Sequence, residues 1–266
     1  MLRRLSLVVG MALVALGLTL PAAAQSGTAK VRVVHASPDA PAVDIFVDGQ
    51  SAMTNVAFFT ASDYMDLPAG AHKVAVAPAG AGEAAAVISA DVTLEANKAY
   101  TIAAVGPLAS IKAQIYNDNL AAPAAGKAHV RVIHASPDAP AVAVKVANGP
   151  TLIPSLAFPN ASDYLPVDAT TYNIQVTPAN ASDVVLDLPN TTLTAGTIYD
   201  VFAVGNLANI KAEVKTFTPA ASGSSSGAAA PGTLPNTGAG DSLSLALIGL
   251  GVLALAGGFL LRRRTA

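Results

Sequence analysis

Residues 31–43 read VRVVHASPDAPAV, and residues 130–142 read VRVIHASPDAPAV. The two segments lie 99 residues apart and differ at one position, where Val34 of the first corresponds to Ile133 of the second. A period near 100 residues is the length of one ordinary domain and is too long for a solenoid repeat. The sequence therefore predicts two tandem copies of one domain.

The repeat extends through most of both copies. Two further pairs of segments match at nearly the same offset: ASDY at 61–64 and 161–164, and AVGPLASIKA at 104–113 against AVGNLANIKA at 203–212. We therefore place the first domain at residues 28–119 and the second at residues 127–218. A short alanine-rich linker joins them at residues 120–126.

Both copies have the residue pattern of β-strands. Runs rich in β-branched residues recur along each copy, such as VRVV, VDIFV and YTIAAV in the first. Asp48-Gly49 and Asn148-Gly149 are typical of hairpin turns, because these residue types tolerate a positive φ. About seven short strands per copy at this spacing are typical of a β-sandwich. We therefore predict an all-β fold with two tandem immunoglobulin-like β-sandwich domains.

A second pattern shared by the copies lies near their last strands. Both have the spacing Leu-x-x-(Asn/Gly)-x-x-Tyr, at Leu94–Tyr100 and at Leu193–Tyr199. This spacing resembles the tyrosine corner of immunoglobulin-like and fibronectin-like sandwiches, in which the tyrosine hydroxyl bonds to backbone a few residues upstream. The resemblance implies that Tyr100 and Tyr199 are mostly buried, with their hydroxyl groups bonded to the backbone.

The N-terminal residues have the features of a secretory signal peptide. Arg3 and Arg4 form a short positive region, residues 5–20 are apolar, and three alanines follow at 22–24. Signal peptidase requires such small residues just before its cut. An N-terminal membrane anchor is the alternative, but the apolar run is shorter than the ~20 residues of a spanning helix. We therefore predict a signal peptide at residues 1–24.

The C-terminal residues form a second signal. Residues 242–261 carry no charge, and three arginines follow at 262–264. A helix of this length can cross ~30 Å of hydrocarbon. The arginines favour the cytoplasmic side of the membrane, which places the two domains outside. We therefore predict a transmembrane helix at residues 242–261 that holds the chain in the membrane before processing.

The pentapeptide LPNTG stands just before this predicted helix and consists of Leu234, Pro235, Asn236, Thr237 and Gly238. Pentapeptide, spacer, apolar span and basic tail, in this order, resemble the cell-wall sorting signal of sortase substrates. The resemblance implies that a sortase cysteine attacks the Thr237 carbonyl and breaks the Thr237–Gly238 bond. An amine of the cell-wall peptide then takes the acyl group. Sortase and the cell-wall peptide are therefore the expected partners.

The sorting signal would occupy residues 234–266. Residues 219–233, which precede it, are rich in Ala, Ser, Gly and Pro and lack charge. Such a segment buries too little apolar surface to fold, so we expect a disordered stalk. The alternative for the C-terminus is a plain membrane anchor in which the pentapeptide occurs by chance.

The repeated HASPDAPAV segment, together with Asp44 and the Asp48-Gly49 turn that follow it, carries a family resemblance. It resembles the opening motif of domain-of-unknown-function family 4397, a group of extracytoplasmic bacterial β-domains that often occur in tandem. The second copy departs from this pattern at Ala143, where the first has Asp44. The resemblance implies a fold and a location and gives no activity.

The repeated motif is open to a structural interpretation, to metal binding and to the binding of another kind of ligand. Its polar residues His35 and Asp39, with their counterparts His134 and Asp138, could hold the loop by bonding to nearby backbone. Alternatively, their nitrogen and oxygen atoms could bind a metal ion such as zinc or calcium. We favour the structural interpretation and expect no metal and no other cofactor.

Composition argues against several classes of function. Residues 25–237 contain ten basic and sixteen acidic residues without a basic cluster, so nucleic acid is not an expected partner. The chain has no cysteine, which excludes disulfides and thiolate chemistry. It has no tryptophan, which argues against a dedicated carbohydrate-binding face. It also lacks a nucleophile elbow, a phosphate loop and an HExxH motif, so we do not expect an enzyme.

These features together indicate a non-enzymatic bacterial surface protein that lies outside the cell and is anchored to the cell wall by its C-terminus. Two functions remain open at this point. One is an adhesion or binding module for an unknown ligand, and the other is a structural spacer of the cell envelope. An apolar or concave patch at a loop end of a domain would favour adhesion, and a uniformly polar surface would favour the spacer.

Overall fold

The structure of the protein, a computed structural model, describes residues 27–219. The predicted signal peptide, the stalk beyond residue 219 and the sorting signal with its transmembrane helix lie outside these residues. Within the described part of the chain, no helix has the length and apolar character to cross a membrane.

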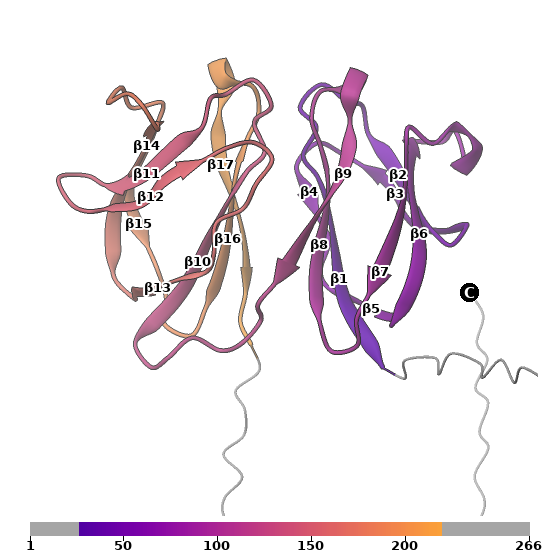
Figure 1. Ribbon diagram of the computed structural model, residues 1–266, viewed down its shortest axis with the longest axis horizontal. Helices are drawn as coiled ribbons and strands as arrows, with labels where there is room; N and C mark the ends of the chain where they lie inside the picture. The colour runs from indigo at the N-terminus through magenta and orange to yellow at the C-terminus, as the bar shows by residue number, and fades with distance from the viewer. Residues whose placement is uncertain (1–26, 220–266) are drawn as a thin grey trace, which may run out of the picture. The chain divides into compact units, whose positions relative to one another are not determined.

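Each sequence copy folds into one β-sandwich (Figure 1). The first is made of nine strands and two 3-10 turns: β1 (Thr28–His35), β2 (Val43–Val47), β3 (Gln50–Val56), β4 (Thr60–Ala61), β5 (Met65–Pro68), β6 (Gly70–Pro78), η1 (Glu83–Ala85), β7 (Ile88–Leu94), β8 (Ala99–Val105), η2 (Leu108–Ser110) and β9 (Lys112–Asp118).

The second sandwich repeats this order with eight strands and one 3-10 turn: β10 (Lys127–His134), β11 (Val142–Val146), β12 (Thr151–Leu156), β13 (Leu165–Asp168), β14 (Thr171–Pro178), β15 (Leu186–Thr192), β16 (Ile198–Val204), η3 (Leu207–Asn209) and β17 (Lys211–Phe217). An isolated bridge between Ile133 and Ala161 takes the place of β4.

Each sandwich consists of two sheets. In the first sandwich the orders are β4-β1-β8-β9, with β5 also paired to β1, and β3-β2-β6-β7. In the second they are β13-β10-β16-β17 and β12-β11-β14-β15. In these orders the first strand of each copy, β1 or β10, has a neighbour on both sides. It runs parallel to one of them, β8 or β16. The all-β prediction with two tandem sandwiches is confirmed.

The strands outnumber the seven or so that the sequence predicts for each copy. The extra ones are edge strands such as β3 (QSAMTNV) and β5 (MDLP). Neither has the β-branched alternation that indicates a strand, and half or more of each is exposed. Their conformation comes from pairing with β2 and β1, which local sequence does not reveal.

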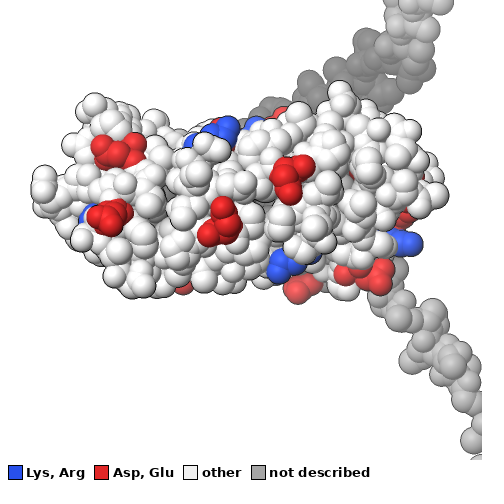
Figure 2. All heavy atoms as spheres, turned by 90° about the horizontal axis from the view of Figure 1, so that it is seen from above, with Lys and Arg blue, Asp and Glu red and all other residues white. Residues whose placement is uncertain are grey.

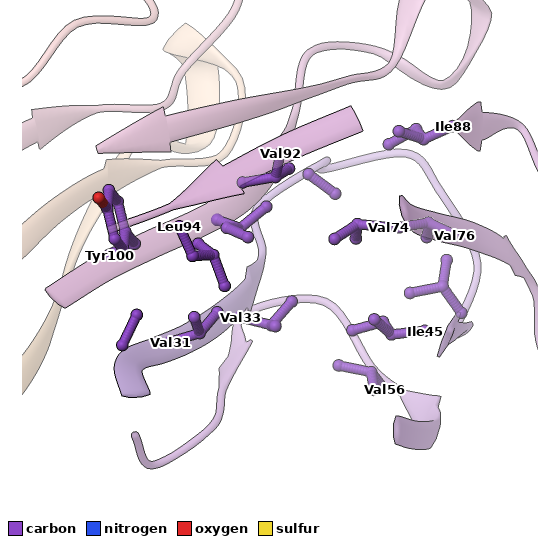
Figure 3. Close-up of a cluster of buried hydrophobic side chains, with 14 residues drawn as sticks. Val31, Val33, Ile45, Val56, Val74, Val76, Ile88, Val92, Leu94 and Tyr100 are labelled. Carbon is purple, nitrogen blue, oxygen red and sulfur yellow. The ribbon is translucent and has the colours of Figure 1, made fainter. Parts of the chain in front are cut away.

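Alternation along β1 and β8 divides their side chains between two cores. Val31 and Val33 on β1, with Tyr100 and Ile102 on β8, pack inside the first sandwich (Figure 3). The residues between them point to the opposite side of the sheet, because successive side chains of a strand alternate. That opposite side is covered by the second sandwich.

The contact between the sandwiches is a buried apolar cluster drawn from both copies. The first copy contributes Val34, Val105 and Tyr116, and the second contributes residues such as Ile133 and Phe202. The Tyr116 hydroxyl also donates to the Pro159 carbonyl oxygen at 2.6 Å. The two sandwiches therefore belong to one compact unit.

Candidate functional site

The repeated HASPDAPAV segment forms the loop after the first strand of each sandwich. The His35 side chain is fully buried, with Nε2 3.1 Å from the Pro41 carbonyl oxygen and Nδ1 3.4 Å from the Ser37 amide nitrogen. Because a carbonyl only accepts and an amide N–H only donates, Nε2 carries the proton and Nδ1 accepts. Burial lowers the pKa of His35, which favours this neutral form.

The second copy repeats this arrangement with one difference. His134 Nε2 lies 3.1 Å from the Pro140 carbonyl oxygen, and burial lowers the pKa of His134 as well. In the first copy the Ser37 hydroxyl donates to the Gly106 carbonyl oxygen at 2.6 Å. Its counterpart, the buried Ser136 hydroxyl, has no hydrogen-bond partner among the described residues.

The two aspartates of the motif bond to backbone at the same end of each sandwich. Asp39 Oδ1 accepts from the Leu108 amide at 2.8 Å, and Asp138 Oδ1 accepts from the Leu207 amide at 2.8 Å. Each carboxylate therefore holds the 3-10 turn that precedes β9 or β17. We call this end of a sandwich its tip, formed by residues 36–42, 79–87 and 106–111 in the first copy and by 135–141, 179–185 and 205–210 in the second.

The structure thus places the motif residues in one loop per copy, where the histidines and aspartates bond to backbone. Among residues 27–219, no group of three or more His, Asp or Glu side chains lies close enough to hold a metal ion.

The two tyrosines have the geometry of a tyrosine corner. Tyr100 is 6% exposed, and its hydroxyl accepts from the Glu95 amide at 3.2 Å. Tyr199 is half-buried, and its hydroxyl accepts from the Thr194 amide at 2.9 Å. Asn97, between Glu95 and Tyr100, has a φ of 62°, which asparagine tolerates.

A buried cluster of four charges lies between the two sandwiches, and sequence reasoning missed it. Arg32 and Asp118 come from the first copy, Arg131 and Asp200 from the second, and all four side chains are at most 3% exposed. Arg131 contacts Asp118 Oδ1 at 2.6 Å and Asp200 Oδ1 at 2.7 Å, and Arg32 contacts Asp200 Oδ2 at 2.5 Å. We call these residues the charge cluster; its formal charges cancel.

Neutral side chains complete the hydrogen bonding of the charge cluster. Asp118 Oδ2 accepts from the Thr101 hydroxyl at 2.6 Å and from the Tyr64 hydroxyl at 2.7 Å. The Arg131 guanidinium carbon lies 4.5 Å from the centre of the Tyr164 ring. Such contacts are required because a buried charge without full hydrogen bonding is costly.

The carboxylates keep both arginines charged inside the protein. Burial on its own would lower the pKa of Arg32 and of Arg131, but the Asp200 and Asp118 carboxylates raise it, and the net shift is upward. The charge cluster is therefore a permanent ionic contact that ties one sandwich to the other.

The position of the acids explains why the sequence did not reveal the charge cluster. The two arginines are equivalent in the repeat, but the acids are not. Asp200 stands where the first copy has Thr101, and Asp118 stands where the second copy has Phe217. A comparison of the two copies identifies the residues that they share. It therefore does not identify Asp118 or Asp200, because each is present in one copy only. The available signal was an arginine in the middle of an otherwise apolar strand.

The five residues of the predicted sortase recognition site, Leu234 to Gly238, lie outside the described residues. The surface of the described part carries few charges. On the face shown in Figure 2, basic and acidic side chains are scattered among uncharged ones and form no large patch of either sign.

Comparison with known families agrees with this architecture. Residues 228–265 match the LPXTG cell wall anchor motif, so the protein is extracellular and is held in the cell wall by its C-terminus. This motif implies processing by a sortase. Residues 29–145 and 130–230 each match the Domain of unknown function (DUF4397). The chain belongs to that family.

Other comparisons give only distant similarities. No curated protein matches the chain in sequence. One solved structure, the CBMbc module (family CBM26) from Eubacterium rectale Amy13K in complex with maltoheptaose, is 11% identical, with a TM-score of 0.21 over 73% of this chain and 97% of that one. A leucine-rich repeat protein from Bacteroides thetaiotaomicron is 12% identical, with a TM-score of 0.17 over 68% of this chain and 26% of that one. TM-scores this low support no conclusion about a ligand.

Proposed function

We propose that this protein is a non-enzymatic adhesion or binding module that presents its two tips, as one rigid pair, away from the cell wall. The chain direction supports the outward orientation. β17 begins at the tip with Lys211 and ends at the opposite end with Phe217, and the wall-attachment residue Thr237 follows Phe217 in the chain. The chain therefore leaves the sandwich toward its wall-attachment residue from the end opposite to the tip.

Reciprocal contacts support a common direction for both tips. Lys112, the first residue of β9, lies with Nζ 6.0 Å from the centre of the Phe158 ring, which packs on His134 at the end of β10. The equivalent contact with the copies exchanged joins Lys211 of the second copy to Phe58 of the first, with Lys211 Nζ 5.7 Å from the centre of the Phe58 ring. Two equivalent tips at one end allow two simultaneous contacts, which raises avidity without any new kind of contact.

The exposed apolar side chains of the tips carry the proposal. Six large hydrophobic residues of the described chain are exposed, and four of them lie in the tips: Val87, Leu108, Val184 and Leu207. Leu108 and Leu207 are equivalent positions of the two copies, whereas Val184 is the residue before Val185, the counterpart of Val87. Exposed apolar side chains at the loop end of a folded surface domain are typical of a protein-interaction site.

The contacts of the motif support a non-enzymatic role. Both nitrogens of His35 and of His134 are engaged with backbone groups, and both rings are buried. Asp39 and Asp138 accept backbone amides of the turns. Polar atoms that are already bonded inside the protein are poor candidates for acid–base or nucleophilic work on a substrate.

A structural spacer is the second candidate. The charge cluster favours it, because a buried ionic contact between sandwiches fixes their geometry whether or not the tips bind anything. The two functions differ in one observable respect. Substitution of the exposed side chains of the tips should impair an adhesion module and should not impair a spacer.

Adhesion of whole cells distinguishes the two functions. Cells that display the wild type should bind at least one of immobilised collagen, fibrinogen, mucin or wall polysaccharide more strongly than cells without the protein. The variant Leu108→Ser/Leu207→Ser should lose most of that binding. The matched control is Ile115→Ser/Val214→Ser, which changes an equivalent exposed pair in the middle of β9 and β17. Equal adhesion by wild type and the tip variant would favour the spacer.

A further inference from the structure

The interiors of the two sandwiches are filled to different extents. The second sandwich contains a cavity of about 170 Å³ between its two sheets, whereas the corresponding region of the first encloses about 10 Å³. Protein interiors are normally packed with few voids larger than a water molecule. A cavity of this size in one copy and not in the other therefore needs a local cause.

The first cause is the size of the side chains that line the cavity. Equivalent strand pairing identifies the counterpart of each lining residue in the first copy. Four lining residues carry one methylene less than their counterparts: Val144 for Ile45, Val201 for Ile102, Val167 for Leu67 and Val214 for Ile115. Two others are larger, Ile174 for Val74 and Leu188 for Ala90, so side-chain size accounts for only part of the cavity.

The second cause is a bulge in β15. In the first copy, β6 and β7 pair without interruption, and Val92 on β7 is 2% exposed. In the second copy the register between β14 and β15 shifts between Tyr172 and Ile174, and Asn190 takes a φ of 54°. The shifted register puts Thr191 where the first copy has Val92, so a polar residue of the same shape replaces an apolar one in the core.

The lining of the cavity offers no free hydrogen-bonding side chain among the described residues. Two of the lining residues carry a hydroxyl group, and both hydroxyls are already bonded. The Tyr172 hydroxyl donates to the Asp168 carbonyl oxygen at 3.1 Å, and the Thr191 hydroxyl donates to the Leu188 carbonyl oxygen at 3.0 Å. Water needs two to four polar partners to occupy a cavity, and an aliphatic cavity without them stays dry or takes an apolar guest.

The cavity is reached from solvent on the side of β15 and β17. Val214 of β17 lines it and is 48% exposed. Leu193, just after β15, is half-buried, whereas its counterpart Leu94 in the first copy is 1% exposed. A guest can therefore enter without unfolding the sandwich.

We propose that the second sandwich binds a small uncharged apolar molecule, about the size of one aromatic ring, in this cavity. An aliphatic cavity of ~150 Å³ is large enough to bind benzene, so about 170 Å³ is sufficient for a guest of that size. The first sandwich is filled and takes none. This binding is separate from the proposed adhesion at the tips, because the cavity lies between the sheets.

Titration of the full-length protein with benzene tests the proposal. We expect saturable binding at one site and a rise in melting temperature with benzene concentration, because a ligand that binds the folded state stabilises it. Val144→Ile/Val201→Ile restores the side chains of the first copy and should weaken the affinity at least tenfold. The reciprocal variant Ile45→Val/Ile102→Val leaves the cavity intact and should bind with wild-type affinity.

Contacts between benzene and the protein, measured in solution, give an independent readout if the Val144→Ile/Val201→Ile variant does not fold. Intermolecular nuclear Overhauser effects should join the benzene protons to the methyl groups of Val144 and Val201 in the wild type. The proposal is overturned if the wild type shows no saturable binding, if the folded Val144→Ile/Val201→Ile variant binds as tightly as the wild type, or if the benzene protons contact surface methyl groups instead.

Discussion

The first and second sandwiches share twelve of thirteen residues in their opening segment, yet their interiors differ. In the first, both Asp44 carboxylate oxygens accept backbone amides, from Asn55 and Gly80, each at 2.8 Å. Ala143 stands at that position in the second and makes neither bond. The second sandwich also keeps a buried Tyr164 hydroxyl without a partner among the described residues, where the Tyr64 hydroxyl of the first bonds to Asp118.

This difference teaches that the loop motif does not depend on a tightly packed core. In each copy the loop is held by contacts within the tip itself, from the motif histidine and the motif aspartate to nearby backbone. The same loop can therefore be kept at the tips of two sandwiches while one interior is filled and the other is left open. The following predictions test this contrast, from the largest expected effect to the smallest.

The two arginines of the charge cluster should differ in importance. Arg131 contacts both carboxylates and the Asn117 carbonyl oxygen, whereas the close contacts of Arg32 are with Asp200 and Thr101. Removal of one partner of a buried ion pair costs about 3–5 kcal/mol, because the other charge stays buried. Arg131→Met should lose an amount in this range in urea unfolding, and Arg32→Met should lose less. Equal or negligible losses would contradict this assignment of roles.

The two cores should respond differently to the same truncation. Leu94 is 1% exposed and Leu193 is half-buried beside the cavity. Leu94→Ala should lower the free energy of unfolding by about 2–5 kcal/mol, the usual cost of a leucine deletion in a full core. Leu193→Ala should cost roughly half as much, since fewer contacts are lost. Chemical denaturation of both variants checks this, and a larger loss for Leu193→Ala would show that the second interior is filled.

Acid should destabilise both sandwiches through the motif histidines. The pKa values of His35 and His134 are lowered by burial, so below the unfolded value of about 6.5 the unfolded chain binds more protons than the folded one. Their contribution is fully present above pH 6.5 and falls as the pH drops below it, by at most about 1.4 kcal/mol per pH unit for each histidine.

The pH experiment needs a background that lacks His72. The carboxylate of Asp48 raises the pKa of His72 against the opposing effect of burial, so His72 contributes stability at low pH that is lost as the pH rises. Unfolding of the His72→Gln variant should therefore become easier between pH 6.5 and pH 5. Stability that is constant over this window would mean that the motif histidines are not buried in the neutral form.

The tyrosine corners should give equal, small effects in the two copies. Tyr100→Phe and Tyr199→Phe each remove the acceptor of one backbone amide and leave the ring in place. Each should lower the free energy of unfolding by about 1 kcal/mol, the net value of one hydrogen bond. Thermal or urea unfolding of both variants checks this. A much larger loss in one copy would show that its hydroxyl group has a role beyond the corner.

Within the two sandwiches, the sequence predicted the features that both copies share and did not predict those that only one copy has. Two sandwiches could be predicted because the same features occur in both copies at an offset of 99 residues: the β-branched runs and the Leu–Tyr spacing. The charge cluster escaped notice because Asp118 and Asp200 come from non-equivalent positions and meet only through packing of one copy on the other. The cavity escaped notice because it depends on the bulge near Asn190 and on single methylene differences, which a strand pattern does not register.

The central claim, that the tips face away from the wall, can be measured on intact cells. The chain has no cysteine, so a single one can be placed at the tip by Leu108→Cys or at the opposite end by Ala122→Cys, where the residue is also exposed. A large membrane-impermeant maleimide should label Leu108→Cys much faster than Ala122→Cys on cells, and both at equal rates after muralytic release. Faster labelling of Ala122→Cys, or equal labelling on intact cells, would contradict outward presentation of the tips.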